Sequence, residues 1–382
     1  MKGDFMVDPR VEKVADFLVN YSAKVKEGDK VYLSSDSLEA LPWFVTVRNR
    51  IIENGAFPYE HFLFDSQGSG RHSRDRCWMK YASGKQLQTL SEIKLAEMKA
   101  MDAYIGIGGE TNTKYLADID PARITMRKRT TQPIDTERLT KRWVVTRYPT
   151  AAYAQEAGMS TEEFSDFVYG SIIGIDWNKQ KKLNQKVKKV FDNAKEVRII
   201  GKDTDLTFSL DGREGVCDNG EHNMPGGEVF YAPIHTSLRG HIRYSYPVME
   251  EGKEVDGIHL EFDDKGRIVK STAVKNQEFL SKMIETDEGS HYIGEFGIGN
   301  NTRIDKYMKN VLFDEKIGGT VHTAIGRAYE ENVKPNDPHG RNLSAIHWDI
   351  VKDLRLQAGG GEIIVDGKVV QKDGEWTFAS GE

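Results

Sequence analysis

The first half of the chain alternates segments with helical and strand-like hydrophobic periodicity. Apolar side chains recur at helical spacing over 11–25, 38–54 and 87–101. Short apolar runs typical of strands lie at 30–35, 57–64, 103–107 and 141–146. Helices and strands that alternate with short connections build an open, largely parallel sheet. We therefore predict an α/β domain for this half.

The second half begins with a helical segment and then changes to short strands. Residues 161–194 follow a helical pattern, and their last part is amphipathic and rich in lysine. Asp366-Gly367 lies between two of the strands and predicts a hairpin. We expect an α/β N-terminal domain at 1–194 and an α+β domain at 195–382. The β segments of the second domain are expected at 197–201, 206–210, 228–231, 258–262, 268–272, 362–365, 368–371 and 375–378.

The composition is that of an ordinary globular protein. The chain has 382 residues, of which 38% are hydrophobic and 29% are charged, a balance that excludes a disordered chain. The formal net charge of −6 gives no reason to expect nucleic acid as a partner. Apolar runs stay well short of the ~18–20 residues of a membrane span, so we expect no membrane partner either.

Cysteine content and the N-terminal pattern bear on the compartment. Two cysteines, Cys77 and Cys217, are too few to staple a chain of this length and suggest a reducing environment. The first thirteen residues carry three acidic side chains and lack an apolar stretch, so we expect no signal peptide. These observations predict a cytoplasmic protein.

Three patterns favour an ordinary structural interpretation. The glycines of 106–109 follow a strand, and a tight turn explains them better than a nucleotide site. The basic run over 123–142 is interleaved with acidic residues, as on a solvated face. Cys217 lies five residues before His222, and we interpret it as a buried structural thiol. The G-x-S-x-G, H-E-x-x-H and C-x-x-C motifs are absent from the sequence.

A dispersed set of histidines and carboxylates in the second half offers more chemistry. His347 and Asp349 form an H-x-D pair, and on a strand their side chains share one face. If the segment that His322 opens is helical, Tyr329 lies two turns further on the same side. Imidazole and carboxylate groups bind Zn²⁺ and similar ions. Each residue alone is more often structural, so spacing leaves a metal site as a hypothesis.

Four segments sharpen this hypothesis when they are taken together and in order. They read MPGGEVF, GEFGIG, FDEKIGGTVHTAIGRAY and NLSAIHWD, and they lie between residue 221 and the C-terminus. In that order they resemble the M29 family of metallo-aminopeptidases, of the aminopeptidase T and aminopeptidase S type. The N-terminal half resembles the family in length and α/β pattern but carries no sharp motif.

The resemblance implies a site for two divalent metals, a homodimer, and peptide substrates with a free N-terminus. Zn²⁺, Co²⁺, Mn²⁺ and Mg²⁺ all remain candidates for the two ions. Carried over by motif, the catalytic tyrosine falls on Tyr329. The metal ligands fall on Glu228, Glu295, His322, His347 and Asp349.

The sequence departs from the family pattern at three points. His235 stands where we expect an acidic residue, and Lys316 replaces an uncharged residue in the segment before His322. The connection from His322 to His347 is also shorter than expected. We expect these differences to affect the wall of the cleft more than the ligand set.

The family chemistry implies a metal-activated water that attacks the first peptide carbonyl. Five side chains are too few for two separate four-coordinate shells, so one carboxylate, Glu228 or Glu295, is expected to bridge. The Tyr329 hydroxyl would stabilise the oxyanion. A glutamate, for which Glu295 is the candidate, would carry the proton to the leaving amine.

Two other functions stay open at this point. Ring-cleaving dioxygenases of the same superfamily hold one Fe(II), and His322, His347 and Asp349 would satisfy such a site. Glu295 discriminates between the two, because a second carboxylate is needed only with two metals. A binding protein that kept the fold without activity is the third reading, which the intact ligand set and Tyr329 disfavour.

Overall fold

The computed structural model describes residues 8–63, 75–250 and 252–378. The chain forms two compact units, one of residues 1–176 and 220–226 and the other of residues 177–219 and 227–382. The expectation of no signal peptide, which rests partly on residues 1–7, and the end of the predicted strand at Phe64 lie outside the described residues. Within the described ranges, every helix is too short or too polar to serve as a membrane span.

The first unit is built on a parallel five-stranded sheet. Its strands lie in the order β2-β1-β3-β4-β8, and every neighbouring pair is parallel. They comprise β1 (Lys30–Ser35), β2 (Phe57–Phe62), β3 (Ala103–Gly108), β4 (Arg142–Arg147) and β8 (Asn223–Met224). All six residues of β3 are buried, as is typical of a central parallel strand with covered faces. The predicted α/β class is confirmed for this region.

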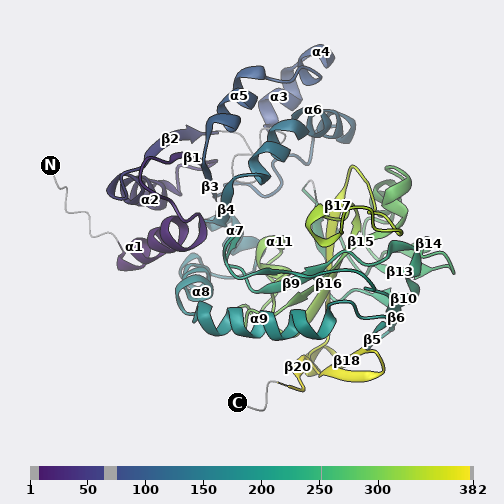
Figure 1. The fold of residues 1–382 in the computed structure, drawn as a ribbon. Helices are drawn as coiled ribbons and strands as arrows, with labels where there is room; N and C mark the ends of the chain where they lie inside the picture. Colours follow the sequence, from purple (N-terminus) through teal and green to yellow (C-terminus); the bar gives the residue numbers. More distant parts are fainter. Residues whose placement is uncertain (1–7, 64–74, 251, 379–382) are drawn as a thin grey trace. The chain divides into compact units, whose positions relative to one another are not determined.

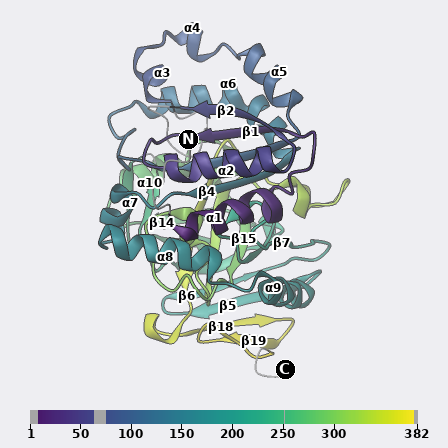
Figure 2. The ribbon, with the colours of Figure 1, turned by 90° about the vertical axis from the view of Figure 1, so that its left-hand side faces the viewer.

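Helices pack around this sheet. Helix α2 contacts α1, β1 and β2, so α1 and α2 lie together on one side (Figure 2). Helix α6 packs against α5 and β4 (Figure 1). The helical segments of this unit are α1 (Pro9–Asp16), the π-helical η1 (Phe17–Ser22), α2 (Leu41–Glu53), α3 (Arg76–Tyr81), α4 (Gly84–Leu87), α5 (Glu92–Ala100), α6 (Pro121–Leu139), α7 (Ala151–Glu156) and α8 (Thr161–Ile173).

We interpreted the basic run over 123–142 as a solvated face. Most of this run forms helix α6, and the structure shows that part of it is buried. Asp120 caps the helix by accepting from the backbone N–H of Ala122, and the helix continues through Pro133. Arg127 is buried at 3% exposure, and its guanidinium lies 4.7 Å from the ring centroid of Trp78. The stem of an arginine is long enough to be buried while its planar head stacks on an aromatic ring. The run therefore contributes to packing as well as to the surface.

The second unit packs two antiparallel sheets against each other. One sheet has the order β17-β16-β15-β9-β7 and the other the order β14-β13-β10-β6-β5-β18-β19-β20. Phe208 of β6 and Phe296 of β15 lie with ring centroids 4.8 Å apart inside the shared core. Helix α9 packs on β7 and β9 and contributes Val187 and Phe191 to this core (Figure 1). Because of these contacts α9 groups with the second unit, whereas our sequence division at 194/195 leaves it in the first domain.

The predicted hairpin at Asp366-Gly367 is confirmed. It joins β18 and β19, and both turn residues have positive φ, 47° and 79°. The strands of this unit are β5 (Val197–Gly201), β6 (Thr204–Phe208), β7 (Val216–Asp218), β9 (Glu228–Tyr231), β10 (Arg239–Arg243), β11 (Val248–Glu250), β12 (Lys253–Val255), β13 (His259–Phe262), β14 (Ile268–Thr272), β15 (Ile293–Gly299), β16 (Thr320–Gly326), β17 (His347–Asp353), β18 (Gly361–Val365), β19 (Lys368–Lys372) and β20 (Glu375–Trp376).

Short helices connect these strands. They are α9 (Trp177–Phe191), η3 (His235–Ser237), α10 (Gln277–Ile284), η4 (Glu288–His291), α11 (Val311–Asp314), η5 (Glu330–Asn332) and η6 (Leu356–Ala358). The α+β class predicted for the second half is confirmed, because its sheets are antiparallel and its helices are peripheral or short.

Candidate metal centre

One face of the five-stranded sheet in the second unit carries all five predicted ligands. Glu228 lies on β9, Glu295 on β15, His322 on β16, and His347 and Asp349 on β17. Side chains alternate between the two faces of a strand. The intervening positions face the apolar core between the sheets, and they include Phe296, Ile298, Val321, Ile325, Trp348 and Ile350.

Small residues on the same face leave room for the ligands. Gly297 of β15 is paired with His322 of β16, and Ala324 lies between Glu295 and Asp349 in the register. A Cβ atom added at Gly297 would lie 2.0 Å from Nε2 of His322. The glycine therefore lets the imidazole lie flat across the neighbouring strand.

The five side chains converge closely. Nε2 of His322 lies 3.2 Å from Oε1 of Glu295 and 3.6 Å from Oε2 of Glu228. Nε2 of His347 lies 3.6 Å from Oε2 of Glu295 and 3.4 Å from Oδ2 of Asp349. Glu295 thus stands between the two histidines, and the structure brings the whole predicted set together.

A backbone contact fixes the orientation of His347. Its Nδ1 lies 2.7 Å from the carbonyl oxygen of Arg327. A carbonyl can only accept, so Nδ1 carries the hydrogen and donates it. In the neutral ring Nε2 then keeps its lone pair and faces the two carboxylates of Glu295 and Asp349, as a metal-binding histidine requires.

Burial and mutual charge shift the acid–base properties of the cluster. Burial raises the pKa of Glu228 to about 8, against the opposing effect of Lys316. Burial works to lower the pKa of His322, but its hydrogen bond to Glu295 and the charge of Glu228 raise it to about 9. Burial works to raise the pKa of Asp349, and the charge of His347 outweighs this and lowers it to about 2. These two carboxylates and this imidazole of the cluster therefore have pKa values far from their ordinary ones.

Several buried atoms of the cluster lack a hydrogen-bond partner among the described residues. An unpartnered buried carboxylate oxygen is costly, and a bound cation is one way to satisfy it. Two overlapping groups have ligand atoms within 4.8 Å of one another, Glu295–His322–Asp349 and Glu228–Glu315–His322. The donor set fits divalent cations. The unpartnered atoms are Oε2 of Glu228, Oε2 of Glu295, Nδ1 of His322 and Oδ1 of Asp349.

Sequence reasoning missed Glu315 as a member of this cluster. The residue caps the C-terminus of α11 and belongs to one of the two candidate groups. Burial raises its pKa, although the charge of Lys316 opposes the shift. The charged run Asp314-Glu315-Lys316 between apolar residues is the signal that points to a buried polar site here.

We expected the differences from the family pattern to affect the wall of the cleft more than the ligand set. Lys316 does not fit this expectation. Its side chain is fully buried, its Nζ lies 3.1 Å from Oε1 of Glu228, and it also forms an ion pair with Glu315. Burial works to lower the pKa of this ammonium, but Glu228 and Glu315 outweigh that effect and raise it. The lysine contacts the ligand set directly.

The segment that His322 opens is not helical, so the helical spacing considered for Tyr329 does not apply. Residues 320–326 form strand β16, and Tyr329 follows in the turn before η5. Tyr329 nevertheless reaches the cluster, with its ring centroid 4.7 Å from that of His347 and 5.9 Å from that of Phe230. The end of the strand at Gly326, rather than helical spacing, brings the phenol to the site.

Two further sequence candidates lie apart from these contacts. His235 packs edge-on against Tyr292, with ring centroids 5.2 Å apart. Burial lowers the pKa of His235, and the charges of Arg213 and His339 add to the effect. Cys217 lies on β7, half-buried against the core rather than fully buried as predicted.

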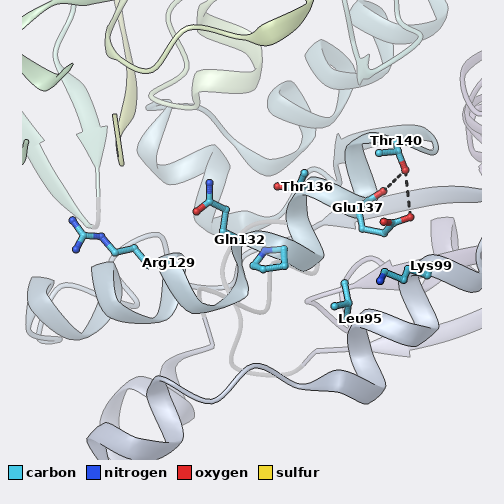
Figure 3. A pocket seen from close by; sticks show the side chains of 8 residues that line it. Leu95, Lys99, Arg129, Gln132, Thr136, Glu137 and Thr140 are labelled. Carbon is cyan, nitrogen blue, oxygen red and sulfur yellow. Dashed lines mark hydrogen bonds between the residues drawn. The ribbon is translucent and has the colours of Figure 1, made fainter. Parts of the chain in front are cut away.

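A hollow of about 390 Å³ in the first unit has no comparable chemistry (Figure 3). Lys99 and Arg129 are exposed there, and Glu137 is held by Thr140 and Lys141. Its lining does not bring together a group of metal-binding side chains. The lining residues are Leu95, Lys99, Arg129, Gln132, Pro133, Thr136, Glu137 and Thr140.

The chain is similar to known aminopeptidases in sequence and in fold. Aminopeptidase 2 of Geobacillus stearothermophilus is 24% identical over 98% of this chain and 97% of its own length. Aminopeptidase T of Thermus aquaticus is 33% identical over 38% of this chain and 36% of its own. The solved structure of AmpT from Thermus thermophilus covers 96% of this chain and 99% of its own, with a TM-score of 0.80 at 20% identity.

A second fold relative belongs to another reaction class. The structure of 2,5-dihydroxypyridine dioxygenase from Pseudomonas putida KT2440 has a TM-score of 0.58 and 13% identity, and it covers 96% of this chain and 97% of its own. At this identity the likeness concerns the fold alone.

Carboxylates and imidazoles gathered on one sheet face are the donor set of a metal-dependent enzyme. The model of the family described as thermophilic metalloprotease (M29) matches residues 7–376, and the chain belongs to that family. The resemblance seen in the sequence and the expected enzyme class, a metallo-aminopeptidase, are both confirmed.

Proposed function

We propose that the protein is a dinuclear metallo-aminopeptidase that releases the N-terminal residue of peptides. The observation that carries this proposal is the convergence of five buried or largely buried donors, several with unpartnered atoms, on one sheet face. The proposed ligands are Glu228, Glu295, His322, His347 and Asp349.

The arrangement of the donor groups supports two ions rather than one. Four carboxylates, those of Glu228, Glu295, Glu315 and Asp349, meet a single ammonium, that of Lys316. When all four carboxylates are ionised, one divalent ion leaves the cluster net negative and a second leaves it net positive by the same amount, so charge alone fits either number. The two overlapping donor groups offer two positions rather than one.

The residues of the chain have distinct roles in the proposed hydrolysis. When bound, the divalent cations supply Lewis-acid chemistry that lowers the pKa of a water from ~15.7 towards ~7. Glu295, between the two histidines, accepts the proton of the attacking water and delivers it to the leaving amine. The Tyr329 hydroxyl donates a hydrogen bond to the oxyanion that forms at the carbonyl. The free α-amine of the substrate would be held by a carboxylate of the cluster or by a bound cation.

The competing dioxygenase function has weaker support in the site. A mononuclear Fe(II) centre of two histidines and one carboxylate uses His322, His347 and Asp349 and leaves positions open for oxygen. It gives no role to Glu228 and Glu295, which are buried at 4% and 5% exposure. Burying two further carboxylates without a function is costly. The peptidase uses both.

A substrate panel tests the proposed reaction. Purified protein is incubated with aminoacyl chromogenic substrates, with and without a chelator, and activity is measured again after adding back each divalent ion. We expect chelator-sensitive release from several substrates and none from their N-acetylated forms, which lack the free amine. Equal cleavage of acetylated substrates would contradict the aminopeptidase. Ring cleavage of a dihydroxypyridine with Fe(II), without peptidase activity, would favour the dioxygenase.

We also propose a homodimer in the cytoplasm, with Zn²⁺, Co²⁺, Mn²⁺ or Mg²⁺ as the working ion. The family resemblance supports the dimer, and the cysteine content supports a reducing compartment. Light scattering coupled to gel filtration measures the mass of the particle in solution, and a single-chain mass of 43.2 kDa would rule out the dimer.

A further inference from the structure

Lys316 is a cation built into the candidate metal centre. Its side chain is fully buried, and its Nζ forms ion pairs with Glu228 and Glu315. Both carboxylates belong to the same candidate group, which His322 completes. The ammonium therefore adjoins two of the three members of this group.

Glu228 divides its two oxygens between the lysine and the ligand cluster. Oε1 lies 3.1 Å from Nζ of Lys316, whereas Oε2 lies 3.6 Å from Nε2 of His322 and has no hydrogen-bond partner in the described structure. The lysine thus holds one oxygen and leaves the other directed at the cluster.

The backbone keeps the lysine in this place. The N–H of Lys316 donates to the carbonyl of Phe313 at 3.0 Å, and its carbonyl accepts from Asn301 at 3.0 Å. A Cβ added at Gly299 would lie 2.9 Å from the carbonyl carbon of Lys316, so the segment lies tightly on β15. The side chain begins from a fixed point and is buried along its whole length.

A fixed ammonium opposes a second cation that shares its carboxylates. Like charges repel strongly where the effective dielectric constant is low, and the repulsion falls with distance. The other group contains Glu295 and Asp349, whose closest cationic partners are the two histidines rather than the lysine. The carboxylates of Glu228 and Glu315 therefore form ion pairs with a fixed ammonium, and within the described residues those of the other group do not.

We propose that Lys316 makes the two metal positions unequal, so that the ion held by Glu228 and Glu315 binds more weakly than the ion held by Glu295, His347 and Asp349. This inference rests on the proposed dinuclear function. The weak position then fills and empties with the concentration of the free ion, and the supply of metal regulates the activity.

Titration of the metal-free protein with Co²⁺ tests this inference without measuring activity. Calorimetry gives the stoichiometry and the two dissociation constants, and visible absorption follows the coordination of the ion. We expect two steps for the natural chain that differ at least about 10-fold. Lys316→Met has similar length and no charge, and it should tighten the weaker step at least about 10-fold while changing the stronger step little.

Matched variants identify the origin of the effect. Lys316→Arg keeps the charge and should keep the gap between the steps. Glu228→Gln should remove the weaker step. Lys352→Met removes another buried lysine, on β17, whose Nζ donates to the carbonyl of Lys202 at 2.7 Å, and should leave both steps unchanged. Circular dichroism checks folding, and Lys316→Gln replaces the methionine variant if that variant does not fold.

The possible outcomes separate the two proposals. Two steps of equal affinity in the natural chain, or an unchanged gap in Lys316→Met and Lys316→Gln, overturn the role of Lys316 but leave the dinuclear site intact. A single ion in the natural chain and in every lysine variant overturns the dinuclear proposal itself. A single ion in the natural chain and two in Lys316→Met would show that the lysine excludes the second ion, which overturns the dinuclear proposal for the natural chain and the graded difference in affinity inferred here.

Discussion

The parallel sheet of the first unit and the ligand-bearing sheet of the second unit both bury their central strands. The two sheets differ in the side chains that these strands carry. Strand β3 is fully buried and consists of apolar residues and glycine, and the buried hydroxyl of Ser34 on β1 lies 3.1 Å from that of Tyr104. Strands β15 and β16 are equally buried, yet they carry Glu295 and His322. These two hydroxyls satisfy each other within the chain, whereas the charged cluster leaves buried carboxylate oxygens unpartnered among the described residues. Among the described strands of these two sheets, the unpartnered buried carboxylates lie on the ligand-bearing sheet.

Removing a ligand from the second sheet should have the largest effect. We expect His347→Ala to lower metal content and to reduce kcat at least about 1,000-fold, because the several kcal/mol that a bound ion contributes to the transition state are lost. Elemental analysis after dialysis measures the metal. Ser34→Ala, a buried polar substitution in the first sheet, is the control and should retain full metal content. Full retention in His347→Ala would remove this residue from the ligand set.

Removing the phenolic hydroxyl should separate catalysis from metal binding. Tyr329→Phe keeps the ring that lies beside His347, so metal content should be unchanged. The loss of one oxyanion donor should lower kcat about 10²–10³-fold, or about 2.7–4 kcal/mol. Steady-state kinetics with a chromogenic substrate measures this. An unchanged kcat would contradict the catalytic role.

Chelation should destabilise the second sheet and leave the first unaffected. An ion at 100 times its dissociation constant stabilises the state that binds it by about 2.7 kcal/mol. Hydrogen exchange followed by mass spectrometry should show faster exchange in β15 and β16 after chelation, with no change in β1 and β3. Equal acceleration in both sheets would show that the contrast drawn between them is wrong.

A methyl group at Gly297 should have the smallest of these effects. Its Cβ would collide with the His322 ring, and displacing a ligand in this way should weaken metal affinity about 10–100-fold. Gly108→Ala in the first sheet is the matched control, because its Cβ would meet the far end of the Arg147 side chain, which can move. Calorimetry on both variants compares the two. Equal affinity in Gly297→Ala and the natural chain would argue against the role of the glycine.

Most of the fold followed from periodicity, because its signals are local. The runs 30–35 and 228–231 form strands over the predicted residues. Helix α6 was missed, because Pro133 and a dense run of charges obscure its apolar stripe. Strand β16 was not predicted, because both its faces are buried and its sequence therefore lacks clear alternation.

The candidate site, too, could be predicted from the sequence only in part. The resemblance identified all five residues that the structure brings together, since motif order carries that information. It did not place Glu315 and Lys316 among them, because their role depends on a turn that returns α11 to the sheet. Burial of a charged pair is a tertiary property, and the local sequence shows only that charges interrupt an apolar run.

The contact between His347 and the carbonyl of Arg327 has a consequence for the loop that follows β16. The same peptide segment leads, two residues later, to Tyr329, and its Arg327 N–H donates to the carbonyl of Ile346, next to His347. One short stretch of main chain therefore sets both the imidazole and the phenol. A substitution that tilts this stretch would misalign the two rings together, so under the proposed function it would impair metal binding and catalysis at once.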